Sequence, residues 1–173
     1  MPNATQSAPL AMPSAPSTNL PAAGPANFMQ SNDRFLLNAS NRADIDPNGF
    51  FDVIGHGSPT SFEVNVTGSK MAVNHRVLAN LIKQSPGYTA GQNVRLLSCS
   101  TGCLPDGFAQ NLANYMNVTV EAPSDLLWAY PSGKLAISQG RWEVSRITGV
   151  RRLVPVLPYT GTWRTFEPGG NMP

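Results

Sequence analysis

Two short apolar runs restrict the folds that this chain can adopt more than any other feature of its sequence. Each run leads to a residue whose side chain can act in catalysis. The first covers residues 50–54 and leads into Gly55-His56-Gly57, and the second covers residues 94–97 and leads into Ser98-Cys99. Short apolar runs bounded by Gly, Asn or Pro are typical of buried strands in a parallel sheet. Because ligands bind outside the carboxyl ends of such strands, we expect His56 and Cys99 to lie at the edge where active sites form.

The first 27 residues differ in composition from the rest of the chain. They are dominated by Ala, Pro, Ser and Asn. A stretch of this kind buries too little apolar surface to offset the entropy lost on ordering it. We therefore predict a linker over residues 1–27 and one folded domain over residues 28–173, and such a linker suggests a module carried by a longer polypeptide.

Apolar periodicity predicts that strands and helices alternate within this domain. Strands are expected over residues 50–54, 62–66, 93–98 and 118–120, and helices near residues 73–82 and after Asp106, the expected N-cap. Pro131-Ser132-Gly133-Lys134 is a hairpin signature, and strand-like segments follow at 142–146, 153–157 and 162–166. This order predicts an α/β fold, in which helices flank a partly parallel central sheet and a β-rich C-terminal extension follows.

Charge and hydropathy exclude several classes of function. A net charge of +2, with no Lys/Arg run longer than two residues, argues against a nucleic-acid partner. No apolar run approaches the roughly 18 residues of a membrane span, and the first residues lack the pattern of a signal peptide. No Cys/His cluster has zinc spacing, so we expect neither a metal nor a cofactor, and we expect Cys99 and Cys103 to be free thiols.

Cys99 and His56 are the residue types that a thiol-dependent hydrolase needs. Such an enzyme requires a base for the thiol proton and backbone N–H groups that hold the oxyanion of the attacked carbonyl. We expect His56 to be the base and Cys99 to be a nucleophile with a lowered thiol pKa. The N–H groups of Gly57 and Cys99 are the expected oxyanion donors, since glycine exposes its backbone without obstruction. Either residue alone is more often structural, but their occurrence at equivalent strand ends favours catalysis.

The same two blocks resemble a known group of enzymes. An apolar strand ending in His-Gly, followed by an apolar strand ending in a small residue and Cys, is similar to the caspase-like cysteine peptidases. The segment from Val53 to Trp128 also resembles a C-terminal toxin module of bacterial polymorphic toxins, through Leu97-Ser98-Cys99-Ser100-Thr101-Gly102, a Phe-Ala-Gln-Asn-Leu-Ala helix and an Ala-Pro-Ser-Asp-x-x-Trp stretch. The resemblance implies a small caspase-like sandwich with a catalytic dyad of His56 and Cys99 and with Gly57 in the oxyanion hole.

The resemblance also implies a setting for this activity. It implies a protein substrate, a cognate immunity protein, and release from a bacterium as part of a larger delivered polypeptide; a cytoplasmic protein is the other expectation. Asp125, after the strand predicted over residues 118–120, either faces the site and favours a basic substrate residue or is a loop cap. Two further functions stay open, namely a non-catalytic binding module on the same fold and a deamidase-type toxin that uses the same cysteine.

Overall fold

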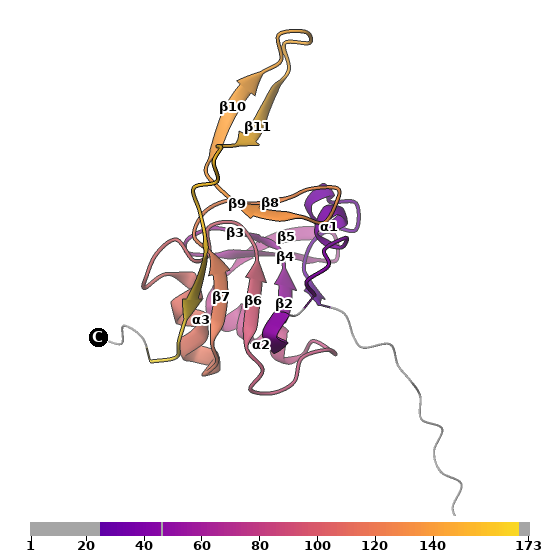
Figure 1. The fold of residues 1–173 in the computed structure, drawn as a ribbon. Coiled ribbons are helices and arrows are strands. Elements are labelled where there is room, and N and C mark those ends of the chain that lie inside the picture. Colours follow the sequence, from indigo (N-terminus) through magenta and orange to yellow (C-terminus); the bar gives the residue numbers. More distant parts are fainter. Residues whose placement is uncertain (1–24, 46, 170–173) are drawn as a thin grey trace, which may run out of the picture.

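A five-stranded mixed sheet forms the centre of the computed structural model, which describes residues 25–45 and 47–169 (Figure 1). The strand order is β1-β2-β6-β7-β12. Four strands pair in parallel, β1 (Ala26–Asn27), β2 (Phe51–Ile54), β6 (Val94–Leu97) and β7 (Val120–Pro123), and β12 (Trp163–Phe166) pairs antiparallel with β7. The predicted α/β class with a partly parallel central sheet is confirmed.

Short helices and smaller antiparallel sheets surround this centre. The helices are α1 (Arg34–Ala39), α2 (His75–Lys83) and α3 (Phe108–Met116), with a 3₁₀ turn at η1 (Pro47–Gly49). One sheet contains β3 (His56–Gly57), β4 (Phe62–Val66) and β5 (Ser69–Val73), and two hairpins pair β8 (Leu127–Ala129) with β9 (Leu135–Ile137) and β10 (Gly140–Val144) with β11 (Arg151–Pro155). Within the described residues, no helix is long and apolar enough to cross a membrane.

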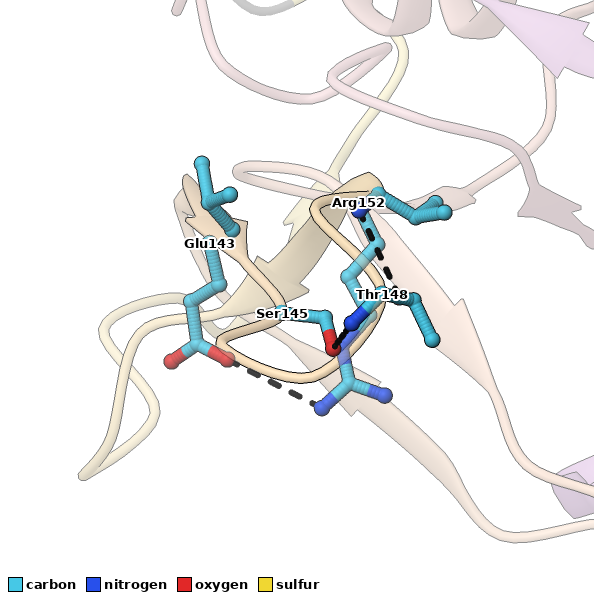
Figure 2. Close-up of a pocket in the computed structure, with 6 residues that line it drawn as sticks. Glu143, Ser145, Thr148 and Arg152 are labelled. Carbon is cyan, nitrogen blue, oxygen red and sulfur yellow. Dashed lines mark hydrogen bonds and ion pairs between the residues drawn. The ribbon is translucent and has the colours of Figure 1, made fainter.

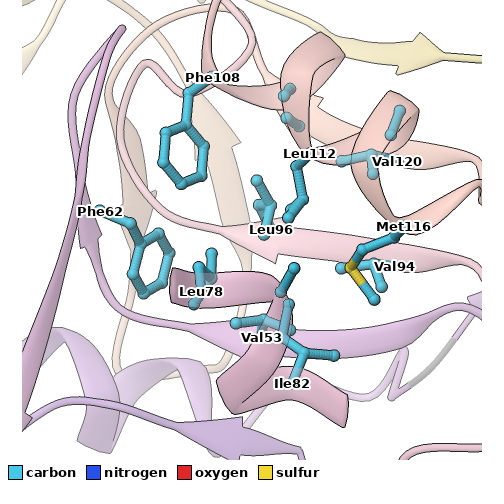
Figure 3. Close-up of a cluster of buried hydrophobic side chains, with 14 of the residues drawn as sticks. Val53, Phe62, Leu78, Ile82, Val94, Leu96, Phe108, Leu112, Met116 and Val120 are labelled. Carbon is cyan, nitrogen blue, oxygen red and sulfur yellow. The ribbon is translucent and has the colours of Figure 1, made fainter. Parts of the chain in front are cut away.

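The larger apolar core lies between one face of the central sheet and helices α2 and α3 (Figure 3). Leu78 and Ile82 lie four residues apart on α2, so both point from the same side of the helix into this core, where both are fully buried. Phe62 of β4 stacks on Phe108 of α3 with 6.2 Å between ring centroids. The three-stranded sheet is therefore attached to the same core as the helices.

A second apolar cluster covers the opposite face of the sheet. Ile54 of β2 and Leu97 of β6 belong to it, together with side chains of α1 and of the β8–β9 hairpin. Their neighbours Val53 and Leu96 belong to the first core, because successive side chains of a strand point to opposite faces. The sheet is thus buried on both faces, as the near-continuous apolar runs predicted.

Charged side chains are buried within this second face. Asp52 and Arg95 lie opposite each other on β2 and β6, and Arg95 Nε is 2.6 Å from Asp52 Oδ1. Arg42 Nη2 is 2.6 Å from the other carboxylate oxygen of Asp52, and these three residues are between 0% and 4% exposed. Arg95 also pairs with Asp44 at 3.0 Å and lies over the ring of Trp163. This network attaches the segment after α1 to the middle of the sheet.

Helix α3 begins differently from the prediction. Its N-cap is Gly107, not Asp106, and no side chain caps it. The first helical N–H groups are instead satisfied by backbone carbonyls from elsewhere in the fold, since Phe108 N donates to Pro59 O and Ala109 N donates to Thr101 O. Asp106 as N-cap is therefore wrong, because tertiary backbone contacts perform the role of a side-chain cap.

Other boundaries also differ from those expected. The helix predicted from residue 73 begins at His75, because Asn74 caps it and the preceding residues form β5. The strand predicted over residues 118–120 is β7 and begins at Val120, because Asn117 ends α3 in the left-handed region with φ 55°. The linker predicted over residues 1–27 falls mainly on residues 1–24, outside the described range, while Ala26–Asn27 pair with β2. The hairpin predicted around residues 131–134 is confirmed as β8–β9.

Candidate active site

The carboxyl ends of β2 and β6 bring His56 and Cys99 to neighbouring positions. Ile54 and Leu97 pair in register, and each candidate residue follows its strand by two positions. Gly57 makes this approach close, since a Cβ built on it would lie 3.0 Å from Cys99 O and 2.6 Å from Thr101 Cγ2. A side chain at position 57 would displace the turn that carries Cys99, so the site requires glycine there.

Both candidate side chains lie on the α1 side of the central sheet. Cys99 packs against the second apolar cluster, to which Leu36 and Ala39 of α1 belong. His56 contacts Asp33, the N-cap of the same helix. Imidazole and thiol therefore lie on the same face of the sheet at adjoining strand ends.

Asp33 is a candidate functional residue that sequence reasoning missed. Its Oδ2 lies 2.9 Å from His56 Nε2, and its Oδ1 accepts the N–H of Phe35 at 2.8 Å. Burial by itself raises the pKa of Asp33, but the hydrogen bonds from His56 and Phe35 and the positive charge of His56 lower that pKa below its ordinary value. The carboxylate orients the ring through Nε2, which leaves Nδ1 for proton exchange.

The sequence could have identified Asp33 as a helix N-cap, but not as the partner of His56. An Asp directly before the apolar residues of a helix is an N-cap signal. The contact with His56, however, spans 23 residues and depends on how α1 packs on the sheet. No local pattern encodes that distance.

Cys99 rests as a neutral, half-buried thiol. Its Sγ lies 3.8 Å from the carbonyl oxygen of Leu127, and within the described range it has no hydrogen bond with His56. Burial raises the pKa of the Cys99 thiol, and the negative charge of Asp125 raises it further. The expectation of a lowered thiol pKa is therefore wrong, because apolar packing and a nearby carboxylate both disfavour the thiolate. Cys99 and Cys103 are both free, as expected.

Within the described residues, neither N–H group predicted as an oxyanion donor is hydrogen-bonded to a neighbouring strand. The N–H of Cys99 has no acceptor among the described residues. Ser58 N donates to Ser61 O, so the adjacent pair Gly57–Phe62 is a non-hydrogen-bonded pair of the antiparallel β3–β4 ladder. The N–H of Gly57 therefore points away from β4.

Asp125 takes part in local bonds beside the cysteine. Its backbone oxygen accepts the N–H of Ser100, and its Oδ1 accepts the N–H of Leu126 at 2.8 Å. These bonds support its interpretation as a loop cap. A role in selecting a basic substrate residue stays a prediction.

A small cavity that the sequence did not predict opens beside the imidazole. It has a volume of 160 Å³, and its lining residues are His56, Gly57, Ser58, Ser61, Glu63 and Ala72. The Glu63 carboxylate pairs with Lys70 at 3.3 Å, so the charge in this cavity is balanced from within the fold. Across residues 25–45 and 47–169, no three or more His, Cys, Asp or Glu side chains gather to hold a metal ion.

Alkylation of Cys99 by iodoacetamide should have a pH midpoint above the ordinary thiol pKa of 9.0, because the folded protein raises the pKa of this thiol. At neutral pH the reaction should accordingly be slower than that of a small unstructured thiol. Asp125→Asn should move the midpoint downward, since it removes a negative charge near sulfur. Peptide mapping by mass spectrometry as a function of pH measures both, and a wild-type midpoint below 9.0 would contradict the burial argument.

Comparison with known proteins gives a family match. Residues 24–137 match a family model described as "Domain of unknown function (DUF8616)". No curated protein and no solved structure matches the chain. The matched segment contains Asp33, His56 and Cys99 and ends before β10.

Proposed function

The chain belongs to the DUF8616 family, whose description states no activity, and from its site we propose that it is a cysteine peptidase or a closely related thiol-dependent amide hydrolase. One observation carries the proposal. His56, oriented by Asp33, and Cys99 follow adjoining parallel strands and lie on the same face of the sheet. A nucleophile, a base and a group that orients the base are the parts that amide hydrolysis through a covalent intermediate requires.

The proposed reaction proceeds through a thioester. Cys99 Sγ attacks the amide carbonyl while its proton passes to His56 Nδ1, and the N–H groups of Gly57 and Cys99 donate to the oxyanion. His56 then gives that proton to the departing amine as the C–N bond breaks. A water molecule, deprotonated by His56, attacks the thioester and releases the carboxylic acid and the thiol. Asp33 stabilises the imidazolium ion formed in each half of the cycle.

Because the Cys99 thiol is neutral before substrate binds, its proton is transferred to His56 during the attack on the carbonyl and not before it. A thiol whose pKa is raised by burial does not form a stable thiolate–imidazolium pair before substrate arrives. Rotation about the Cα–Cβ bond of Cys99, away from the Leu127 carbonyl, is the motion that directs Sγ toward the imidazole. Catalytic hydrogen bonds that form only with substrate bound are common in such enzymes.

The biological setting of the proposal rests on the resemblance to bacterial toxin modules. In that setting the substrate is a protein, the chain acts as an effector carried by a larger delivered polypeptide, and a cognate immunity protein inhibits it. The caspase-like sandwich belongs to the same proposal. The mixed sheet with helices against it is compatible with such a fold.

The proposal is tested by a search for new protein N-termini. Cell extract is incubated with wild-type protein or with Cys99→Ala, and terminal amines are labelled and identified by mass spectrometry. We expect new N-termini with the wild type and none with the variant. Identical profiles would contradict a peptidase. Side-chain mass increases of about one dalton without new N-termini would instead indicate a deamidase acting through the same thioester chemistry.

A non-catalytic binding module is the second candidate, and one observation favours it. The Cys99 thiol packs against an apolar cluster, and burial raises its pKa. Structural cysteines have the same two properties. Such a module would bind the same proteins before and after Cys99→Ala, and neither protein would alter them covalently.

Asp33→Asn should lower kcat by about 10- to 100-fold with little change in KM, because the amide can no longer stabilise an imidazolium ion. Asparagine is also a good N-cap, so helix α1 should persist. The measurement is steady-state hydrolysis of a peptide identified in the extract experiment. Asp33→Ser keeps a cap and should lose the same activity, and full activity in either variant would contradict the role given to Asp33.

A further inference from the structure

The β10–β11 hairpin and its turn, residues 140–155, form an arm that stands away from the rest of the domain (Figure 1). The two strands pair only with each other in the part of the chain that the structure describes. Gly149, with φ 68°, closes the turn, and Ser145 Oγ accepts the N–H groups of Ile147 and Thr148. The bond between Ser145 and Thr148 is drawn in Figure 2. The turn is thus an ordered structure that holds Ile147 at its apex.

One face of the arm is apolar and exposed. Trp142 lies opposite Leu153 and Val144 opposite Arg151, so these four side chains project from the same face of the ribbon. Trp142 is 61% exposed and Val144 58%, and at the turn Ile147 reaches 96%. Large apolar side chains gathered at this exposure are typical of a surface that contacts another apolar phase.

The arm also concentrates the positive charge of the chain. Its basic residues are Arg141, Arg146, Arg151 and Arg152, and Glu143 is its acidic residue, which gives a net charge of +3. The remaining eight of 12 basic and nine of 10 acidic residues leave the rest of the chain at −1. On the charged face, Glu143 pairs with Arg141 at 2.8 Å. Glu143 also faces Arg152 at 3.9 Å, as Figure 2 shows.

These features select among the partners that could cover the arm. A second copy would bring a further charge of +3 against the first, which opposes association through this surface. A nucleic acid would satisfy the arginines but leave Ile147 and Trp142 in water. An anionic bilayer satisfies both, since apolar side chains enter the acyl boundary, tryptophan lies at the headgroup level and arginines contact phosphate or carboxylate groups.

We propose that residues 140–155 are a membrane-contact arm, which inserts Ile147 and its apolar neighbours into the surface of an anionic bilayer. Arg146 and Arg151 lie beside this apolar tip and meet the lipid headgroups. Arg151 lies over the ring of Trp142, 5.0 Å from its centroid. The positive charge of Arg151 would therefore lie next to Trp142 at the membrane surface. The contact is peripheral and is independent of the chemistry proposed for Cys99.

The test is cosedimentation of the full chain with vesicles of phosphatidylcholine, with and without phosphatidylserine. We expect the wild type to bind the anionic vesicles and to bind neutral vesicles at least tenfold more weakly, since each arginine near an anionic surface contributes about fivefold. Ile147→Asp should reduce binding by about tenfold or more, because it places a charge at the inserting tip. Met71→Asp is the matched control: Met71 is 55% exposed on β5, and its variant should bind as the wild type does.

Tryptophan fluorescence gives a second measurement. The emission of Trp142 should shift to shorter wavelength with anionic vesicles, and this shift should be absent in Trp142→Phe. Circular dichroism of each variant verifies that the fold persists. Failure of the wild type to bind anionic vesicles would overturn the proposal, as would equal binding by Ile147→Asp. Binding to duplex DNA without binding to vesicles would also overturn the proposal, and it would indicate that the arm binds polyanions.

Discussion

Asp52→Ala should lower the free energy of unfolding by about 3–5 kcal/mol, which is a large part of the roughly 5–15 kcal/mol that stabilises an ordinary domain. Asp52 is fully buried and lies 2.6 Å from both Arg42 Nη2 and Arg95 Nε. Without the carboxylate, the guanidinium groups of Arg42 and Arg95 would stay buried with much less negative charge to balance their positive charges. Urea unfolding followed by circular dichroism measures the change.

A surface variant is the control for this experiment. Glu143→Ala removes a carboxylate from an exposed pair with Arg141, and it should change the free energy of unfolding by less than about 0.5 kcal/mol. Asp52→Asn keeps the shape of the side chain and part of its hydrogen bonding. Its loss of unfolding free energy should therefore lie between those of Asp52→Ala and Glu143→Ala. If Asp52→Ala cost less than about 1 kcal/mol, the network would not be the attachment between the segment after α1 and the sheet that we describe.

His56→Gln should reduce hydrolysis by about 10²- to 10⁴-fold, because it removes the base for the thiol proton and the acid for the departing amine. Cys99→Ala should remove hydrolysis to the background level while the protein stays folded, since only one atom, the sulfur of a partly buried side chain, is lost. The measurement is peptide hydrolysis at matched folded protein concentration. Cys103→Ala, which changes the other free thiol, should retain activity.

Double variants separate the proposed roles. Residues that act as one unit show strongly non-additive losses. Adding Asp33→Asn to His56→Gln should therefore cost almost nothing further, because Asp33 acts through the ring that is already gone. Losses that multiply would contradict the arrangement in which Asp33 positions His56.

The sequence predicted the parts of the fold that depend on local pattern. The runs before Gly55 and Ser98 are buried strands, as is typical of near-continuous apolar runs in a parallel sheet covered on both faces. The residues at their ends lie side by side because the two strands pair in parallel, Ile54 with Leu97. The hairpin at residues 131–134 was predictable from its turn residues alone. Strand β5 was not, because four of its five residues are exposed and carry no apolar alternation.

The contacts that give the candidate site its chemistry depend on packing between distant segments. Asp52 and Arg95 sit inside apolar runs, and only the register of β2 against β6 shows that the two charges meet. Asp33 reaches His56 because α1 packs on the same face, and burial around Cys99 comes from the β8–β9 hairpin and α1. Residue types at strand ends could be predicted as candidates, but their partners and the raised pKa of the thiol could not.

The central claim is that Cys99 is a nucleophile assisted by His56, and a covalent probe tests it most directly. Peptidyl acyloxymethyl ketones of varied sequence are incubated with the protein, and adducts are located by intact mass and peptide mapping. We predict one adduct, on Cys99 and not on Cys103, that forms at least about 100-fold more slowly in His56→Gln. No adduct with any peptide, or an adduct on Cys99 whose rate is unchanged in His56→Gln, would contradict the account.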